Sequence, residues 1–263
     1  MLRPLLCVAV VAVLVACVTS PLVPRQLTLF PEAEMASMGV AAYDKMKTEM
    51  PQSSDTRENR YVRCVADAVT AALEGPHAQT RWEVTVFAEA SANAFALPGG
   101  KIGVNTGLLG VARNQDQLAT VLCHEVAHVL ANHSNERVST SFVTQTGLDL
   151  VQSLSGAASP TQQQLLGLLG VGAQVGVLLP FSRTQEREAD LLGLDLMGRA
   201  GFDPGQSVEL WQNMARASQG QPPEFLSTHP SHDTRIRDLE ARIPSAMGLR
   251  DAARAQGRRP SCS

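Results

Sequence analysis

The sequence predicts a mainly helical α+β domain with a small β-sheet. Of its 263 residues, 44% are hydrophobic and 18% are charged, which is enough apolar side chain for one large core. Apolar residues recur at helical spacing along most of the chain, whereas strand-like alternation is confined to a stretch between residues 82 and 105. The formal net charge of −3 and the 4% aromatic content argue against a nucleic acid partner, because neither a basic face nor a stacking surface is available.

The N-terminal residues have the pattern of an export signal. Arg3 precedes an apolar run from Leu5 to Ala16, which suits the core of a signal peptide and is shorter than the roughly 20 residues of a spanning helix. The run ends in Leu14-Val15-Ala16-Cys17, which resembles a bacterial lipobox. The resemblance implies cleavage before Cys17 and acylation of this residue, which would anchor the chain in a membrane. Val18, where a retention signal would have Asp, favours the outer membrane.

The remaining elements follow in order. Residues 1–16 are expected to be a signal peptide, 17–31 a lipidated, proline-rich tether, 32–245 one domain and 246–263 a tail that is frayed from residue 248 onward. Helices are expected at 32–50, 57–73, 115–132, 186–199, 204–218 and 235–242. Trp82, Val84 and Val86 alternate as in a strand, and after a polar, alanine-rich turn Lys101–Asn105 predicts a second strand.

One apolar segment needs a separate comment. Residues 139–180 are rich in glycine and carry almost no charge. A membrane span at 165–180 is the weaker interpretation, because this run is short and interrupted by glycine.

The helix expected at 115–132 carries His124-Glu125-x-x-His128. Positions i and i+4 lie on one face of a helix, so both imidazoles can bind one zinc ion, with Glu125 beside them to take a proton from the attacking water. The flanking Leu118, Val121, Leu122, Val129 and Leu130 would bury this group, and buried ionisable side chains need a partner or a metal. The sequence therefore predicts a catalytic metal site.

A catalytic zinc usually has three protein ligands, so a third is expected from another helix. Glu186 and Asp190 are also four residues apart and share a face, whereas Glu188 is expected to point to solvent. Taken alone, this segment is better explained as an acidic helix start, because Glu and Asp favour the first turn. The histidine motif upstream favours a ligand.

Together these motifs resemble the zinc metallopeptidase family that includes HtpX and the CAAX prenyl proteases, and the lipobox resembles its periplasmic lipoprotein branch, which includes LoiP and BepA. Further matches are Asn93–Ile102, Gly201–Pro204 and Ser227–Pro230, and the resemblance covers roughly residues 30–245. It implies a zincin-like (gluzincin) fold in which His124, His128 and Glu186 bind one zinc ion. It also implies that Glu125 is the general base and that Asp190 orients His124.

The resemblance implies a zinc endopeptidase that degrades misfolded or mis-assembled proteins of the bacterial cell envelope, facing the periplasm. The alternative is an assembly or chaperone-like lipoprotein with a latent zinc site, with the outer-membrane assembly machinery as a partner. In some relatives a histidine at the position of His229 fills the place of the catalytic water. The other interpretation of His229 is a loop histidine near the site, on an extended backbone before Pro230 and after a flexible loop at 219–223.

Two further expectations concern the strand and the cysteines. Lys101, Ile102, Gly103, Val104 and Asn105 are expected to form an edge strand along which the substrate is added, with an ordinary internal strand as the alternative. Cys64 and Cys262 are expected to form a disulfide in an oxidising compartment, the alternative being two unpaired thiols. Cys123 is expected to be a free, buried thiol.

Overall fold

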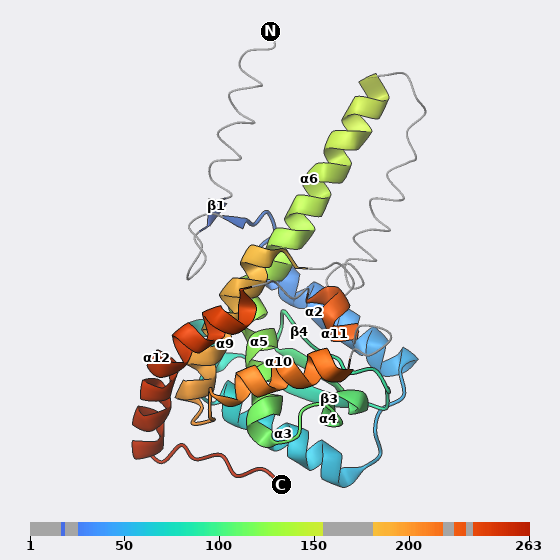
Figure 1. Ribbon diagram of the computed structural model, residues 1–263. Coiled ribbons are helices and arrows are strands. Elements are labelled where there is room, and N and C mark those ends of the chain that lie inside the picture. The colour runs from blue at the N-terminus through green and yellow to red at the C-terminus, as the bar shows by residue number, and fades with distance from the viewer. Residues whose placement is uncertain (1–16, 19–25, 155–180, 218–223, 230–233) are drawn as a thin grey trace.

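The computed structural model describes residues 17–18, 26–154, 181–217, 224–229 and 234–263, and it confirms a mainly helical fold with a small sheet (Figure 1). Its longer helices are α2 (Glu32–Glu49), α3 (Thr56–Thr70), α5 (Gln115–Leu130), α6 (His133–Leu154), α9 (Arg183–Arg199), α10 (Gln206–Ala217) and α12 (Arg235–Ala255). The strands of the main sheet are β3 (Glu83–Phe87), β4 (Ala94–Leu97) and β5 (Lys101–Asn105). Shorter elements are β1 (Cys17–Val18), β2 (Gln26–Leu27), η1 (Gly75–Gln79), α4 (Thr106–Leu109) and α11 (Glu224–Thr228).

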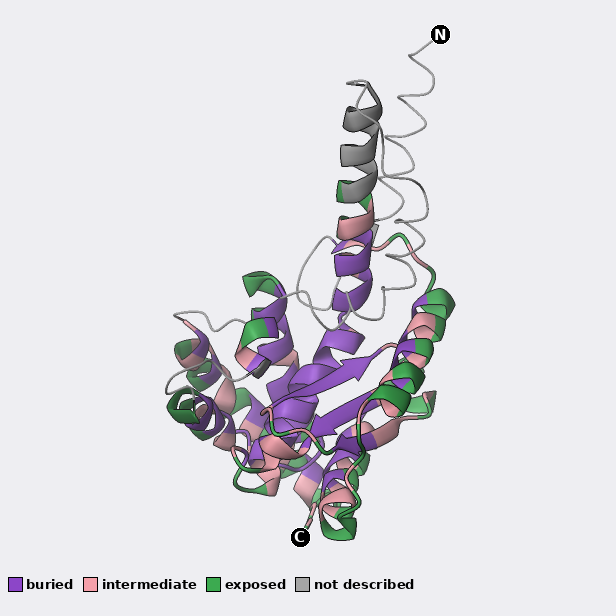
Figure 2. Ribbon diagram, turned by 90° about the vertical axis from the view of Figure 1, so that its right-hand side faces the viewer, coloured by how far each residue is buried: buried purple, intermediate pink, exposed green. Residues whose placement is uncertain are grey.

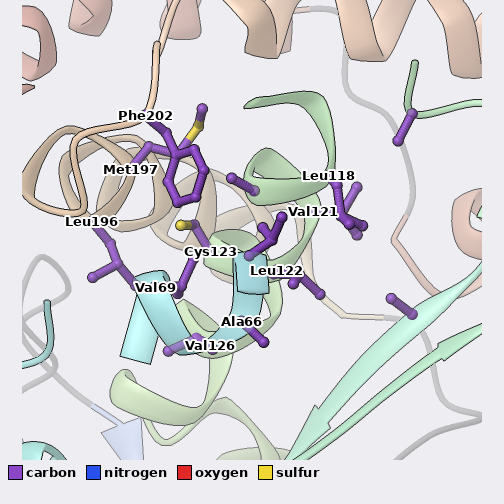
Figure 3. Packing of buried hydrophobic residues seen from close by; sticks show 14 of the residues in the cluster. Ala66, Val69, Leu118, Val121, Leu122, Cys123, Val126, Leu196, Met197 and Phe202 are labelled. Atoms are coloured by element: carbon purple, nitrogen blue, oxygen red, sulfur yellow. The ribbon is translucent and has the colours of Figure 1, made fainter. Parts of the chain in front are cut away.

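Helix α5 runs through the centre of the molecule and is buried almost all round (Figure 2). The side chain of Asn114 caps its first turn by accepting a hydrogen bond from the Gln117 amide at 2.9 Å. Apolar side chains of α5 pack against those of α3 and α9, and against Phe202, which follows α9 (Figure 3). A helix held on several sides can present polar side chains in a fixed geometry, which is what a metal site requires.

The three-stranded sheet has the order β3-β5-β4, with β5 parallel to β3 and antiparallel to β4. The prediction that Lys101–Asn105 is an edge strand is therefore wrong, because β5 is hydrogen-bonded on both sides. The residues taken for an alanine-rich turn contain β4, whose four residues are all buried. Because this strand is covered on both faces, its sequence lacks the alternation that reveals a half-exposed strand.

Helix α9 lies between α5 and α12, and two glycines allow the close approach. A Cβ at Gly193 would lie 3.1 Å from the His124 amide nitrogen, and one at Gly198 would lie 2.3 Å from the Ala246 carbonyl oxygen. Glu188 is only 2% exposed. The expectation that Glu188 points to solvent is wrong. Helix α6 contacts α9 here, through His133 with Glu188 and through Glu136 with Gln185.

The C-terminal segment is ordered to its end. Helix α12 continues through Pro244 to Ala255, beyond the boundary expected at residue 245. Cys64 and Cys262 form a disulfide, and Gln115 accepts a hydrogen bond from the Cys262 amide and donates one to the Pro260 carbonyl. The expectation of frayed residues from 248 onward is wrong, since packing on α9 and the disulfide outweigh the weak helical pattern. Cys123 is a free, buried thiol, as predicted.

The N-terminal tether is docked onto the domain from Gln26 onward. Strand β1 pairs with β2, the Gln26 amide group donates to the Ala131 carbonyl at 2.7 Å, and the Leu29 amide donates to the Ser139 hydroxyl. Among the residues that the structure describes, no helix combines the length and the apolar character needed to cross a bilayer. The segments assigned to the signal peptide (1–16), the apolar run at 165–180 and the loop at 219–223 lie outside the described residues.

Candidate metal centre

Four side chains from three elements converge on one point. His124 and His128 come from α5, Glu186 from α9, and His229 follows α11; one donor atom from each lies within 4.8 Å of every other. His124 Nε2 is 3.1 Å from His128 Nε2 and 3.2 Å from His229 Nδ1. Glu186 Oε1 is 2.9 Å from His229 Nδ1 and 3.4 Å from His128 Nε2. All four residues are buried.

These separations fit a tetrahedral metal ion. Donors about 2.0–2.2 Å from a tetrahedral zinc are about 3.3–3.6 Å from one another. The 3.4 Å between Glu186 and His128 lies in this range, and the other three separations are shorter, so the donors would move slightly apart around an ion. Three imidazole nitrogens and one carboxylate also match the ligands that zinc prefers. The residues present therefore suit a zinc ion.

Local structure explains how His229 reaches the cluster. Its amide donates to the Phe225 carbonyl at 2.8 Å, so the chain reaches His229 through the last turn of α11. Its ring stacks on that of Phe225 with 4.4 Å between centroids, and Phe181 stacks on His128 at 3.7 Å. The extended backbone expected at His229 itself stays a prediction. Both interpretations of His229, a metal ligand and a loop histidine near the site, place its ring close to the metal. Its Nδ1 lies among the donor atoms.

The carboxylates on α9 balance the charge of the site. Burial lowers the pKa of His124, but hydrogen bonds and attraction from Asp190 and Glu186 outweigh it and raise that pKa to about 9. Burial raises the pKa of Glu186, yet hydrogen bonds with the three histidines bring it far below its ordinary value. The carboxylates thus stabilise positive charge on His124, whereas burial lowers the pKa of His128 well below its ordinary value. A metal cation would be stabilised by the same carboxylates.

Glu125 lies beside the cluster without belonging to it. Its Oε1 is 3.3 Å from His229 Nε2, and the side chain is 3% exposed. Burial raises its pKa, while attraction to His229 and His124 opposes the rise. A raised pKa suits a carboxylate that has to accept a proton and release it again.

Asp190 lies behind His124, with Oδ1 3.0 Å from Nδ1 of the imidazole. Arg235, at the start of α12, completes this side of the site in a way that the sequence did not predict. It donates from Nε to Asp190 at 2.7 Å and from Nη2 to Glu186 at 2.6 Å, is 1% exposed, and lies over the ring of Trp211 at 3.7 Å. The one signal for it was indirect, since two buried acids on a helix face need a cation.

Comparison with known proteins agrees with this geometry. Residues 56–243 match Peptidase family M48. The chain is 39% identical over 175 residues to the mitochondrial metalloendopeptidase OMA1 of Schizosaccharomyces pombe, covering 66% of this chain and 50% of that protein. It is 32% identical over 223 residues to the beta-barrel assembly-enhancing protease of Yersinia pestis, covering 82% of this chain and 45% of that protein. A third relative is the human metalloendopeptidase OMA1, at 30% identity over 216 residues.

The chain spans half or less of the length of these three relatives, at 50%, 45% and 41%. The family match, in contrast, covers well over half of the chain and includes all four donors and Glu125. The resemblance drawn from the motifs is thereby confirmed, and the chain belongs to peptidase family M48.

Proposed function

We propose that the protein is a zinc-dependent endopeptidase. The observation that carries this proposal is the convergence of His124, His128 and Glu186 on one point with the carboxylate of Glu125 alongside. A zinc ion held there would supply Lewis acidity, which promotes the attack of water on a peptide carbonyl. No described residue beside the cluster has a better position than Glu125 to handle the protons of that reaction.

The roles of the side chains follow from their surroundings. Glu125 takes one proton from the attacking water and delivers it to the amine that leaves when the C–N bond breaks. Oδ1 of Asp190 lies 3.0 Å from Nδ1 of His124, and its charge would keep the proton on this nitrogen, so that Nε2 of the ring faces the metal. Arg235 holds both Asp190 and Glu186 and compensates their charge inside the protein.

An extended substrate would bind along β4 rather than β5. β4 is an edge of the sheet and contacts α5, and the Ala96 backbone lies near enough to Glu125 to lower the pKa of this carboxyl. A peptide added to this edge would therefore bring its carbonyl next to the general base.

The donor set also favours a latent resting form. His124, His128, Glu186 and His229 would fill all four positions of a tetrahedral ion, whereas a catalytic site keeps one position open. His229 must then move aside before a substrate can react. Replacing it with Ala should raise casein turnover at equal metal content, and equal or lower turnover would contradict this role.

The cellular setting rests on the sequence and on the relatives. The lipobox ending in Cys17 supports a lipoprotein of the bacterial cell envelope, facing the periplasm and anchored in the outer membrane. The name of the Yersinia relative supports envelope proteins as substrates and the outer-membrane assembly machinery as a partner. The names of the OMA1 relatives, which are mitochondrial, support only the endopeptidase activity. The latent donor set keeps an assembly or chaperone-like role as the second candidate.

Casein degradation by the purified protein tests the proposed activity. We expect cleavage that a zinc chelator abolishes, and that Glu125→Gln abolishes while about one zinc per chain is retained, because Glu125 is not a ligand. Glu49→Gln, at an exposed site on α2, is the control and should change neither quantity. Cleavage by the Glu125→Gln variant at the parent rate would contradict the proposal.

A further inference from the structure

The second ligand histidine, His128, has its own support behind the cluster. Its Nδ1 lies 2.8 Å from Nδ1 of His133, and Nε2 of His133 lies 3.1 Å from Oε2 of Glu188. The three side chains are 1%, 0% and 2% exposed, so this contact is shielded from water. Neither His133 nor Glu188 belongs to the donor set.

The backbone between the two histidines is built for this contact. In an uninterrupted helix, a residue five positions after His128 would be rotated by about 140° away from it. The chain instead leaves α5 at Asn132, whose φ of 55° is the only positive value among the described non-glycine residues. This left-handed residue ends α5 and starts α6 at His133, which turns the His133 ring back onto His128.

Only one arrangement of protons serves a metal. Nε2 of His128 is in the donor set, so it must offer a lone pair and its proton must sit on Nδ1. That N–H donates to Nδ1 of His133. The proton of His133 is then on Nε2 and is donated to the carboxylate of Glu188. In this arrangement, each N–H group of the series faces one hydrogen-bond acceptor.

We propose that His133 and Glu188 are positioning residues for the metal, and that they act on His128 as Asp190 acts on His124. We call the series His128–His133–Glu188 the relay. It fixes the tautomer of His128 and holds this ring towards the donor set. It also passes part of the negative charge of Glu188 to His128 through the imidazole of His133. This inference rests on the proposed zinc site but not on catalysis. A purely structural contact between α6 and α9 would explain the burial but would leave metal affinity unaffected.

Zinc affinity tests the relay without any substrate. The dissociation constant is measured by competition with a fluorescent chelator for the parent, His133→Leu and Glu188→Gln. We expect His133→Leu to weaken zinc binding about 10–100-fold, the usual effect of losing such a partner, and Glu188→Gln to weaken it about 10-fold. The matched control is Glu136→Ala, which removes the Gln185–Glu136 hydrogen bond of 2.6 Å between the same two helices.

The outcomes separate the relay from the zinc site itself. Weaker binding in both relay variants with unchanged binding in Glu136→Ala supports the relay. Parent-like affinity in folded His133→Leu, or equal losses in Glu136→Ala, would overturn it. If His133→Leu does not fold, the zinc affinity of Glu188→Gln is the test, because this change preserves the size of the side chain and a hydrogen-bond acceptor. Parent-like zinc affinity of Glu188→Gln would then overturn the relay. A parent protein that binds no zinc would instead refute the proposed function.

Discussion

The two ligand histidines of α5 are supported in different ways. His124 is backed directly by the carboxylate of Asp190, which Arg235 also holds, so its support is part of a buried charge network that includes Glu186. His128 is backed by the imidazole of His133, with the carboxylate of Glu188 one step further away. The difference predicts that damage on the His124 side costs folding stability as well as metal affinity, whereas damage on the His128 side mainly costs affinity.

The largest effect is expected from Arg235→Met. The change preserves bulk but leaves two carboxylates buried without their cation, and breaking a buried ion pair costs about 3–5 kcal/mol. Urea unfolding of the metal-free protein measures it. Arg242→Met is the control, because Arg242 also joins α12 to α9 by pairing with Asp195 but is 37% exposed. Arg242→Met should lower the free energy of unfolding by only about 0–1 kcal/mol. Similar losses in the two variants would contradict the difference between the two sides of the site.

A smaller effect is expected for metal binding when Asp190 is replaced by Ala. The variant should bind zinc about 10–100-fold more weakly, because Nδ1 of His124 loses its acceptor. It should also be less stable without metal, since Arg235 loses a partner. Because Asp190 and His133 act on different histidines, the Asp190→Ala/His133→Leu double variant should show the sum of the two free-energy losses to within about 0.5 kcal/mol. A double variant that binds zinc no more weakly than one single variant would show that the supports are not separate.

The smallest effect is expected at the junction of α5 and α6. A left-handed conformation costs an L-residue with a Cβ about 1–2 kcal/mol, and Asn tolerates it better than Ala. Asn132→Ala should therefore lower the free energy of unfolding by about 1 kcal/mol, and Asn132→Gly should leave it nearly unchanged. Equal stability of the Ala and Gly variants, measured by urea unfolding, would show that this backbone conformation does not matter.

The same contrast shows how far the sequence could predict the site. The support of His124 could be anticipated, because the family resemblance implied it and helical spacing places Asp190 on the same face as Glu186. The support of His128 could not, because it depends on one left-handed residue at Asn132 and on the unpredicted helix α6, which covers Glu188. Arg235 escaped prediction for a similar reason, since its role depends on how α12 packs against α9.

The fold follows the same rule. The helices with clear periodicity, such as α3 and α5, appeared within a few residues of their expected bounds. Elements whose sequence pattern is weak because tertiary contacts stabilise them were missed. These are β4, buried on both faces, and the second half of α12, which passes through Pro244 and ends near a disulfide.

The central claim is that His124, His128, Glu186 and His229 together hold one zinc ion, and X-ray absorption at the zinc edge tests it most directly. The spectra give the number of imidazole ligands in the zinc-loaded parent and in His229→Ala. We predict three imidazoles and one carboxylate in the parent, and two imidazoles with about one zinc per chain still bound in the variant. Two imidazoles already in the parent, or loss of the zinc from His229→Ala, would contradict the claim.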